Sequence, residues 1–263
     1  MKAVHGVILV LVLLLGANAL PKPRQINRQV LEARLRKLSA PGFRSELDDN
    51  LRRFIDTVVR DVIINGRPEL GLPVLDPLEV EHLDFDIALE SVKAKGSVDK
   101  VVIRGASKFV VESVKTDPDN LRAEVDISLA EARVEAEHYK LEGDLLNGAL
   151  PLEGEGRLEA DLRELRLKVI VELGVREDES VEVRLLELDV SLGQADVKLE
   201  NLLGGGDLGE IANGLISSAL PDLVESEKGS VLPQIADAIK SLVNEQLVGK
   251  SLDDILDLIN NFK

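Results

Sequence analysis

Few side chains in this sequence belong to the types that enzymes use for proton transfer or metal binding. Beyond the first twenty residues there are two histidines, His82 and His138, each in or beside a strand-like segment with acidic neighbours. Neither has a partner at metal-ligand spacing, and no Gly-x-Ser-x-Gly motif is present to carry a serine nucleophile. We therefore expect no enzyme activity and no metal site.

A glycine-rich stretch, GGGDLG at Gly204–Gly209, matches Gly-x-Gly-x-x-Gly between a strand-like and a helix-like segment. In a dinucleotide-binding fold the helix is followed by a second strand that carries the ribose-binding acid. No such strand follows here. We interpret the glycines as a hinge and a helix start, and expect no cofactor.

Acidic side chains recur at alternate positions in the middle of the chain. They are Glu124, Asp126, Glu135, Glu137, Glu153 and Glu155. A calcium site would be one interpretation, but the carboxylates lack the fixed loop spacing of an EF-hand. A solvated sheet face is the simpler interpretation.

The composition excludes further classes of protein. The 263 residues include no cysteine, so the chain forms no disulfide, no Cys-ligated metal site and no thiol nucleophile. The formal net charge is -16, and aromatic residues make up 2% of the chain. Such a surface repels phosphate backbones and offers few rings for stacking, so we expect no nucleic-acid binding.

Residues 1–19 are typical of a secretory signal peptide. Lys2 precedes an apolar run over residues 7–15, and Ala17-Asn18-Ala19 has the small-x-small form that signal peptidase accepts. The run is shorter than the roughly 20 apolar residues of a membrane-spanning helix. We expect cleavage near Ala19, a secreted extracellular product and no stable membrane insertion.

We divide the remaining chain into a tail with a short helix over residues 20–44 and one domain over residues 45–263. Ser45 and Asp48 resemble a capping box at the start of a helix roughly 30 Å long, which Gly66 and Pro68 end. Its apolar stripe consists of Leu47, Leu51, Phe54, Ile55, Val58 and Val62.

Between Leu83 and Leu203 the apolar period changes from 3.6 to 2, which predicts an antiparallel sheet with one dry face. The alternation changes parity in three places, after Leu89, after Leu129 and after Leu162. An extra residue at each slip would keep the apolar face inward and curl the sheet. The alternative is that a slip marks a short turn between two strands.

Helical spacing returns after the glycine run. We expect one helix from Leu208 to Pro221, a second over residues 234–248 behind Pro233, and a third over residues 252–262 capped by Ser251. The order of elements predicts an α+β fold, with a long helix wrapped by a highly curved antiparallel sheet and further C-terminal helices.

Three stretches carry a resemblance to a known family. They are GRPELGLPVLDPL at residues 66–78, VIRGAS at residues 102–107, and a pattern of Tyr139, Gly143, Leu145, Leu146, Pro151, Gly154 and Gly156. From about Ser45 onward, the chain resembles the secreted arthropod family of takeout-like and haemolymph juvenile-hormone-binding proteins. It is also similar to mite group 7 allergens, and the implied fold is related to bactericidal permeability-increasing proteins.

The resemblance implies a lipid carrier with an apolar tunnel between the helix and the sheet. Its expected partner is one small lipophilic ligand, such as a terpenoid hormone or a fatty-acid-like lipid; we make no prediction of the oligomeric state. Takeout-like proteins usually carry a disulfide at the start of the long helix, which this cysteine-free chain cannot form. The tunnel mouth that this bridge would brace is therefore expected to differ in shape.

We expect Phe54, Val58, Phe85 and Tyr139 to contact the ligand. For Phe54 and Val58, packing in the core is an equally good interpretation. The Tyr139 hydroxyl could bond an ester, epoxide or carboxyl group in a dry tunnel, or it could simply anchor a strand. A rival hypothesis is an allergen-like or immune-type interaction protein that recognises lipid surfaces without a deep tunnel.

Overall fold

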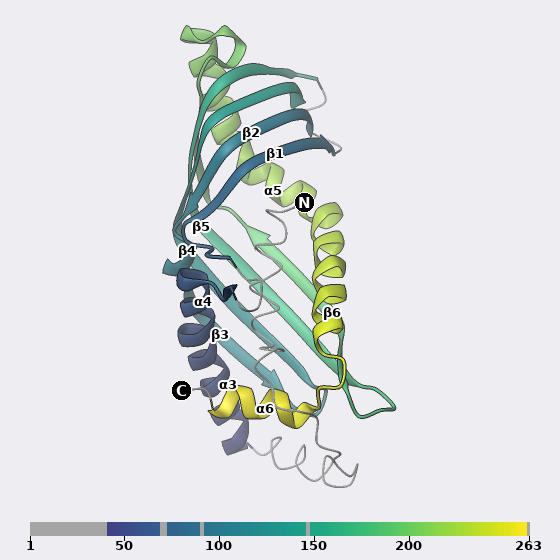
Figure 1. The fold of residues 1–263 in the computed structure, drawn as a ribbon. Coiled ribbons are helices and arrows are strands. Elements are labelled where there is room, and N and C mark those ends of the chain that lie inside the picture. Colours follow the sequence, from purple (N-terminus) through teal and green to yellow (C-terminus); the bar gives the residue numbers. More distant parts are fainter. Residues whose placement is uncertain (1–40, 69–72, 90–91, 146–147, 262–263) are drawn as a thin grey trace.

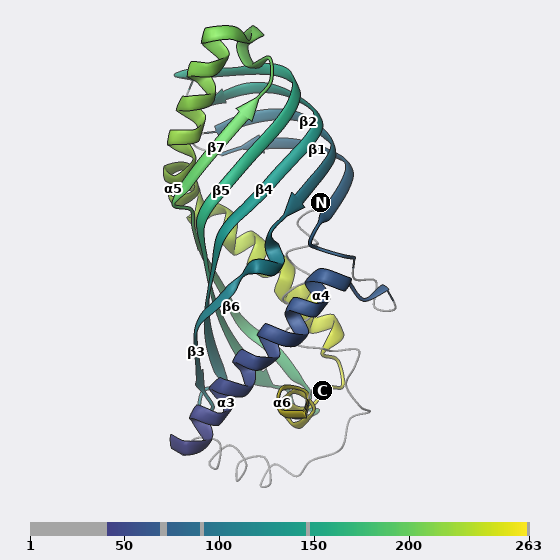
Figure 2. The same ribbon diagram turned by 90° about the vertical axis from the view of Figure 1, so that its left-hand side faces the viewer.

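The computed structural model describes residues 41–68, 73–89, 92–145 and 148–261. The expected signal peptide and the short helix before residue 41 lie outside this part of the chain. One antiparallel sheet runs the length of an elongated body and helices pack along it (Figures 1 and 2). The predicted fold class, a curved antiparallel sheet with long helices, is confirmed.

The first described element is one continuous helix in three parts: α3 (Pro41–Phe54), the π-helical turn η2 (Ile55–Val59) and α4 (Arg60–Asn65). The predicted capping box at Ser45 is wrong, because the chain is already helical at Pro41. The Asp48 carboxylate instead accepts hydrogen bonds from the Thr116 backbone N–H and hydroxyl, at 2.7 and 2.6 Å. Gly66 ends the helix as predicted, with a φ of 66° that favours glycine.

Within the described residues, the sheet has seven strands and two halves. The strands are β1 (Leu78–Ala88), β2 (Val92–Arg104), β3 (Val110–Asp117), β4 (Arg122–Leu145), β5 (Leu150–Val175), β6 (Val181–Ser191) and β7 (Gln194–Leu199). In the lower half of Figure 1 the order is β3-β4-β5-β6, and in the upper half it is β1-β2-β4-β5-β7. The long strands β4 and β5 therefore join both halves.

The parity slips have two different structural causes. The slip after Leu89 separates β1 from β2, so there the alternative interpretation as a turn is the right one. The other two slips lie opposite one another: Leu129 pairs with Leu165 and Glu131 with Arg163, while the intervening Ala130 and Glu164 are not paired.

Each of the two strands thus carries one extra residue at the junction, and the register is the same on both sides of it. Glu164 has a φ of 56°, which turns the following side chains. Apolar residues below this point belong to clusters that include Val125 and Val169, whereas those above it join a separate cluster around Ala160. Because β4 and β5 are irregular at the same point, apolar side chains above and below that point pack into separate hydrophobic clusters.

The C-terminal helices differ from expectation. Instead of two helices separated at Pro221 and Pro233, a single helix, α5 (Gly206–Gln246), contains both prolines. A proline in a helix interior removes one hydrogen bond and bends the helix, but packing on both sides can retain the helix. Figures 1 and 2 show α5 changing direction along its length, with its first part beside β7 and its last part beside β6.

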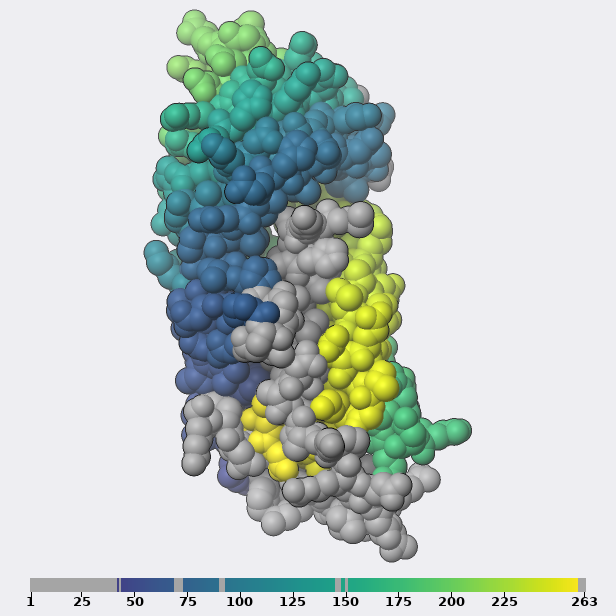
Figure 3. Space-filling model, in the orientation of Figure 1, coloured from purple at the N-terminus to yellow at the C-terminus, as the bar shows by residue number. Residues whose placement is uncertain are grey.

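The helix start predicted at the glycine run and the predicted final cap are both present. A short turn, η5 (Leu202–Gly204), leads into α5, whose N-cap is Gly205. The Ser251 hydroxyl accepts the Asp254 N–H at 3.2 Å and caps α6 (Leu252–Asn261). In the space-filling view, α3–α4 and the last part of α5 flank opposite sides of the lower half (Figure 3), and α6 lies against α3.

Candidate ligand-binding cavity

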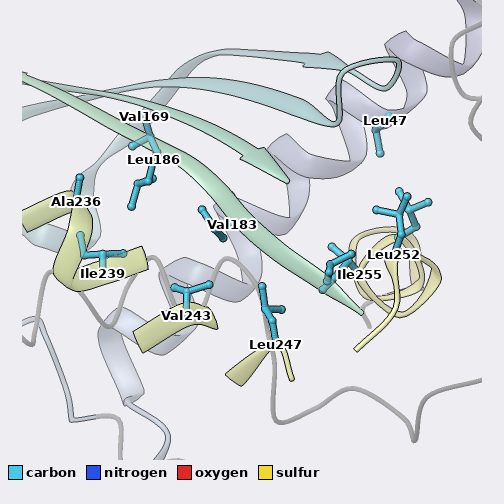
Figure 4. Packing of buried hydrophobic residues seen from close by; sticks show 12 residues of the cluster. Leu47, Val169, Val183, Leu186, Ala236, Ile239, Val243, Leu247, Leu252 and Ile255 are labelled. Carbon is cyan, nitrogen blue, oxygen red and sulfur yellow. The ribbon is translucent and has the colours of Figure 1, made fainter. Parts of the chain in front are cut away.

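An apolar cavity of about 140 Å³ lies between the lower half of the sheet and helices α3, α5 and α6. Eighteen of its lining residues are apolar: Leu47, Leu51, Ile55, Pro118, Leu121, Ala123, Val125, Val169, Val171, Leu173, Val183, Leu186, Ile239, Val243, Leu252, Ile255, Leu256 and Ile259. Figure 4 shows that the labelled side chains of β5, β6 and α5 point toward one another.

Strand register explains the floor of the cavity. Thr116, Ala123, Val171 and Leu186 form one row of cross-strand neighbours through β3, β4, β5 and β6, and all four line the cavity. Side chains directly opposite in an antiparallel sheet point to the same face, so the row is continuous. Four strands at about 4.8 Å spacing make this floor roughly 14 Å wide.

Helical spacing supplies the walls. Leu47, Leu51 and Ile55 recur every four residues on α3–η2, and Ile239 and Val243 do so on α5. Residues four apart lie on the same side of a helix, so each helix presents an unbroken apolar strip. The apolar positions of α6 complete the enclosure.

The cavity volume sets what it can hold without rearrangement. An engineered cavity of about 150 Å³ with aliphatic and aromatic walls stays dry and admits benzene. A cavity of about 140 Å³ with this lining has room for a group of similar size. A longer apolar chain requires lining side chains to move outward, and α6 contributes four of those side chains.

Four polar residues interrupt the apolar lining: Thr116, Asp117, Arg122 and Lys240. Thr116 donates its hydroxyl and backbone N–H to the Asp48 carboxylate, as described above. The hydrogen bond from Asn120 to Asp117, at 2.7 Å, lowers the pKa of the Asp117 carboxyl, and Arg44 lies 3.8 Å away. The Lys240 ammonium contacts Asp237 at 2.7 Å.

The two predicted site residues on the first helix lie behind the cavity wall. Phe54 is fully buried and Val58 is partly buried, and both pack in a cluster with Leu51 and Ile55, which do line the cavity. Neither Phe54 nor Val58 belongs to the described residues of the lining. Their direct contact with a ligand stays a prediction.

The other two predicted site residues lie in the upper half of the sheet. Phe85 is partly buried in β1, and its ring tip lies close to Gly96 on β2. Tyr139 on β4 is 2% exposed, and its hydroxyl donates a 2.7 Å hydrogen bond to the Glu200 carbonyl. Neither is found among the described residues around the cavity. Their role in ligand binding also stays a prediction.

The Tyr139 contact explains part of the sequence pattern around it. A Cβ at Gly154 would lie 2.6 Å from the Tyr139 hydroxyl, so only glycine fits without displacing that hydroxyl. Burial raises the pKa of Tyr139 to about 12. The hydroxyl therefore stays protonated and joins β4 to the turn before α5.

The other two family-like stretches meet in space. Burial of the Asp76 carboxylate would by itself raise its pKa. Hydrogen bonds from Ser107 and Gly105 outweigh this effect, so the pKa of Asp76 is lowered. The two backbone N–H groups donate at 2.8 and 3.0 Å, and the Ser107 hydroxyl donates as well. This contact joins the connection after α4 to the end of β2.

Three of the six acidic side chains singled out in the sequence are paired with cations. Glu124 contacts Lys168 at 2.7 Å, Glu137 contacts Lys100 at 2.6 Å, and Glu135 contacts Arg133 at 3.0 Å. Within the described part of the chain, no group of three or more His, Asp or Glu side chains has a geometry that could hold a metal ion. No helix built from the described residues combines the length and hydropathy of a membrane span.

Sequence reasoning missed the residues of β5, β6 and α5, which make up eight of the 22 described lining residues. Val171 and Leu173 fit the period-2 alternation, but Val183 and Leu186 lie three residues apart, on either side of a bulge in the β5–β6 pairing. Nothing in the alternation distinguishes the half of the sheet that carries the apolar cavity from the other half. The missing signal is the pairing register, which brings distant strands into one row.

Comparison with known structures supports the fold. The crystal structure of Epiphyas postvittana Takeout 1 is similar with a TM-score of 0.58 at 21% sequence identity, covering 78% of this chain and 92% of that chain. A structure of lipopolysaccharide binding protein gives a TM-score of 0.35 at 16% identity, covering 63% and 35%, a likeness too weak to bear on the fold. No curated protein sequence matches significantly.

The sequence itself identifies the family. Residues 13–257 match the family described as haemolymph juvenile hormone binding protein, which is nearly the whole chain and extends the match upstream of the expected domain start at residue 45. Together with the fold, this match shows that the chain belongs to the haemolymph juvenile hormone binding protein family.

Proposed function

We propose that this protein is a secreted carrier that binds one small lipophilic molecule in the cavity between the lower half of the sheet and helices α3, α5 and α6. The carried molecule is a terpenoid or a fatty-acid-like lipid. The protein provides a dry site and catalyses no reaction. Membership of a family described by hormone binding supports a binding role.

The observation that carries the proposal is the predominantly apolar lining of the cavity, in which 18 of the 22 described residues are apolar. Burial of apolar surface contributes roughly 25 cal/mol per Å², so a site with eighteen apolar lining residues favours a hydrocarbon chain or ring over a polar solute. Such pockets, with few polar groups, are typical of small-molecule sites. A protein that only recognised lipid surfaces would not need an apolar cavity between its sheet and helices.

The test introduces a larger side chain on the strand that forms part of the cavity floor. Ala123 is the smallest apolar lining residue, and Ala123→Phe adds a ring to a cavity whose volume resembles one that admits benzene. Ala130 is exposed on the same strand, so Ala130→Phe is a matched control. A neutral fluorescent probe such as 1-aminoanthracene is titrated into the wild type and both variants, with thermal unfolding to verify that each is folded.

We expect the wild type and Ala130→Phe to bind one probe per chain, and the folded Ala123→Phe variant to bind at least tenfold more weakly. Equal binding by all three proteins would place the probe elsewhere and contradict the proposed site. Binding of lipid vesicles by a wild type that takes up no probe would favour the surface-recognition hypothesis instead.

The proposed secretion and domain boundaries have a separate test. Expression of the full chain in an insect-cell culture should release a protein that begins at residue 20, as N-terminal sequencing would detect. A product that remains in the cells with Met1 in place would contradict the assignment of residues 1–19 as a signal peptide.

A further inference from the structure

Lys240 lies where a polar head group would emerge from the cavity. Its side chain lines the cavity between Ile239 and Val243, yet 33% of the side chain is exposed. A lysine in such a position lays its methylene stem along apolar surface and keeps its ammonium at the water boundary. We propose that the Lys240 ammonium binds a carboxylate at the end of the ligand, so that the preferred ligands are long-chain carboxylic acids. This inference rests on the proposed carrier function.

The other polar lining residues are poorly placed for this role. Thr116 already donates its hydroxyl and its backbone N–H to Asp48. Asp117 is held ionised by the hydrogen bond from Asn120, so it repels a carboxylate. Arg122 stands opposite Asp117 and Glu172 in the strand register, so two acidic residues are its cross-strand neighbours.

The present partner of Lys240 can be exchanged. Asp237 lies one turn earlier on α5, its side chain is 72% exposed, and its carboxylate lies 2.7 Å from the Lys240 ammonium. Ion pairs between exposed side chains contribute little to stability because water solvates both groups well. A ligand carboxylate that arrives with its chain buried in the cavity would therefore displace Asp237 at little cost.

The net charge of the protein is a second reason to expect that a cation at the cavity favours an acidic ligand. The whole chain has a formal net charge of -16, which repels an anionic ligand. Among the described lining residues this acidic excess is absent, since Lys240 and Arg122 are cations and Asp117 is the one anion. An acid head group is therefore tolerated at the rim of this cavity more readily than elsewhere on the surface.

The experiment compares laurate with methyl laurate, which share one chain and differ in the charge of the head. Each displaces the neutral probe from the wild type, Lys240→Met, Asp237→Asn and the control Lys228→Met. Methionine keeps an unbranched stem and removes the charge. Lys228 lies on the same helix and forms ion pairs with Asp189 and Glu225, but it does not line the cavity.

We expect Lys240→Met to weaken laurate binding about tenfold, in line with the loss of a charge-assisted hydrogen bond, and to leave methyl laurate binding unchanged. Asp237→Asn removes the internal competitor and should strengthen laurate binding several-fold, a gain that misfolding cannot imitate. Lys228→Met should bind both ligands as the wild type does. The preference for laurate should also decline as salt is raised.

The outcomes separate the two proposals. Equal binding of laurate and methyl laurate by the wild type, or an equal loss of both in Lys240→Met, would overturn the role of Lys240 and leave the carrier function standing. A wild type that binds neither the probe nor either lipid would overturn the carrier function itself.

Discussion

Replacement of Tyr139 by phenylalanine removes one hydroxyl and almost no volume, so its effect can be assigned to one hydrogen bond. The hydroxyl lies 2.7 Å from the Glu200 carbonyl, on a side chain that is 2% exposed. The net value of such a bond is about 0.5–1.5 kcal/mol, and a buried carbonyl left without a partner costs about 1–3 kcal/mol. We expect Tyr139→Phe to lower the free energy of unfolding by about 1–2 kcal/mol.

Thermal unfolding monitored by circular dichroism measures this change. For a protein of this size, 1 kcal/mol corresponds to a shift in Tm of about 2–4 °C, so a decrease of about 2–8 °C is expected. The pH dependence supplies a second readout. Burial raises the pKa of Tyr139 from its ordinary value of 10.0 to about 12 in the folded protein. The stabilisation is therefore complete below pH 10 and is lost as the pH rises through 12.

The same variant distinguishes the two roles considered for Tyr139. The structural role predicts lower stability and unchanged affinity for laurate and methyl laurate, since Tyr139 lies in the upper half of the sheet and apart from the cavity lining. An unchanged Tm together with weaker binding of these oxygenated lipids would refute this reasoning. The hydroxyl would then be a ligand-binding group.

Three other substitutions test further parts of the structure. Phe54→Ala should destabilise the protein by about 3–5 kcal/mol in urea denaturation because Phe54 is fully buried. Its control, Leu208→Ala, changes a side chain that is 65% exposed and should alter stability by less than about 0.5 kcal/mol. Asp254→Ala removes the acceptor of the Ser251 N–H and hydroxyl bonds, and should weaken both thermal stability and probe binding because α6 lines the cavity. Asp76→Asn should destabilise the protein at pH 7. A lowered carboxyl pKa stabilises the folded state only above that pKa, so the difference in stability from the wild type should shrink as the pH falls through the lowered pKa of Asp76. Equal differences at pH 7 and pH 3 would contradict this expectation.

Much of the fold could be predicted because hydrophobic periodicity is a local property. The change of period near Leu83 predicted the sheet, and the glycine at position 66 predicted the helix end, where φ is 66°. The Ser251 cap of the last helix was also readable, since a hydroxyl followed by an acid three residues later satisfies the first turn.

The features that sequence reasoning missed depend on tertiary contacts. Pro221 and Pro233 are local helix breakers, yet α5 continues through both because its two ends pack on different strands. The slips after Leu129 and Leu162 looked like two independent events and became one junction only when β4 and β5 were paired.

The candidate site was harder to predict than the fold. Periodicity identified inner-face residues, but such positions, including the four predicted site residues, also mark a packed core. The cavity forms where rows of side chains leave the space between α3, α5 and α6 unfilled. Strand register and the placement of the helices determine which rows these are.

The central claim is that a lipophilic ligand occupies the cavity of the lower half. Methyl NMR on protein labelled at isoleucine tests it most directly, because isoleucines lie both inside and outside the cavity. On titration with a small lipophilic ligand such as laurate, the methyl signals of Ile55, Ile239 and Ile255 should shift, while those of Ile216 and the exposed Ile211 on the first part of α5 should not. Shifts confined to Ile211 and Ile216, with the cavity isoleucines unchanged, would contradict the claim and place the ligand on the upper half of the molecule.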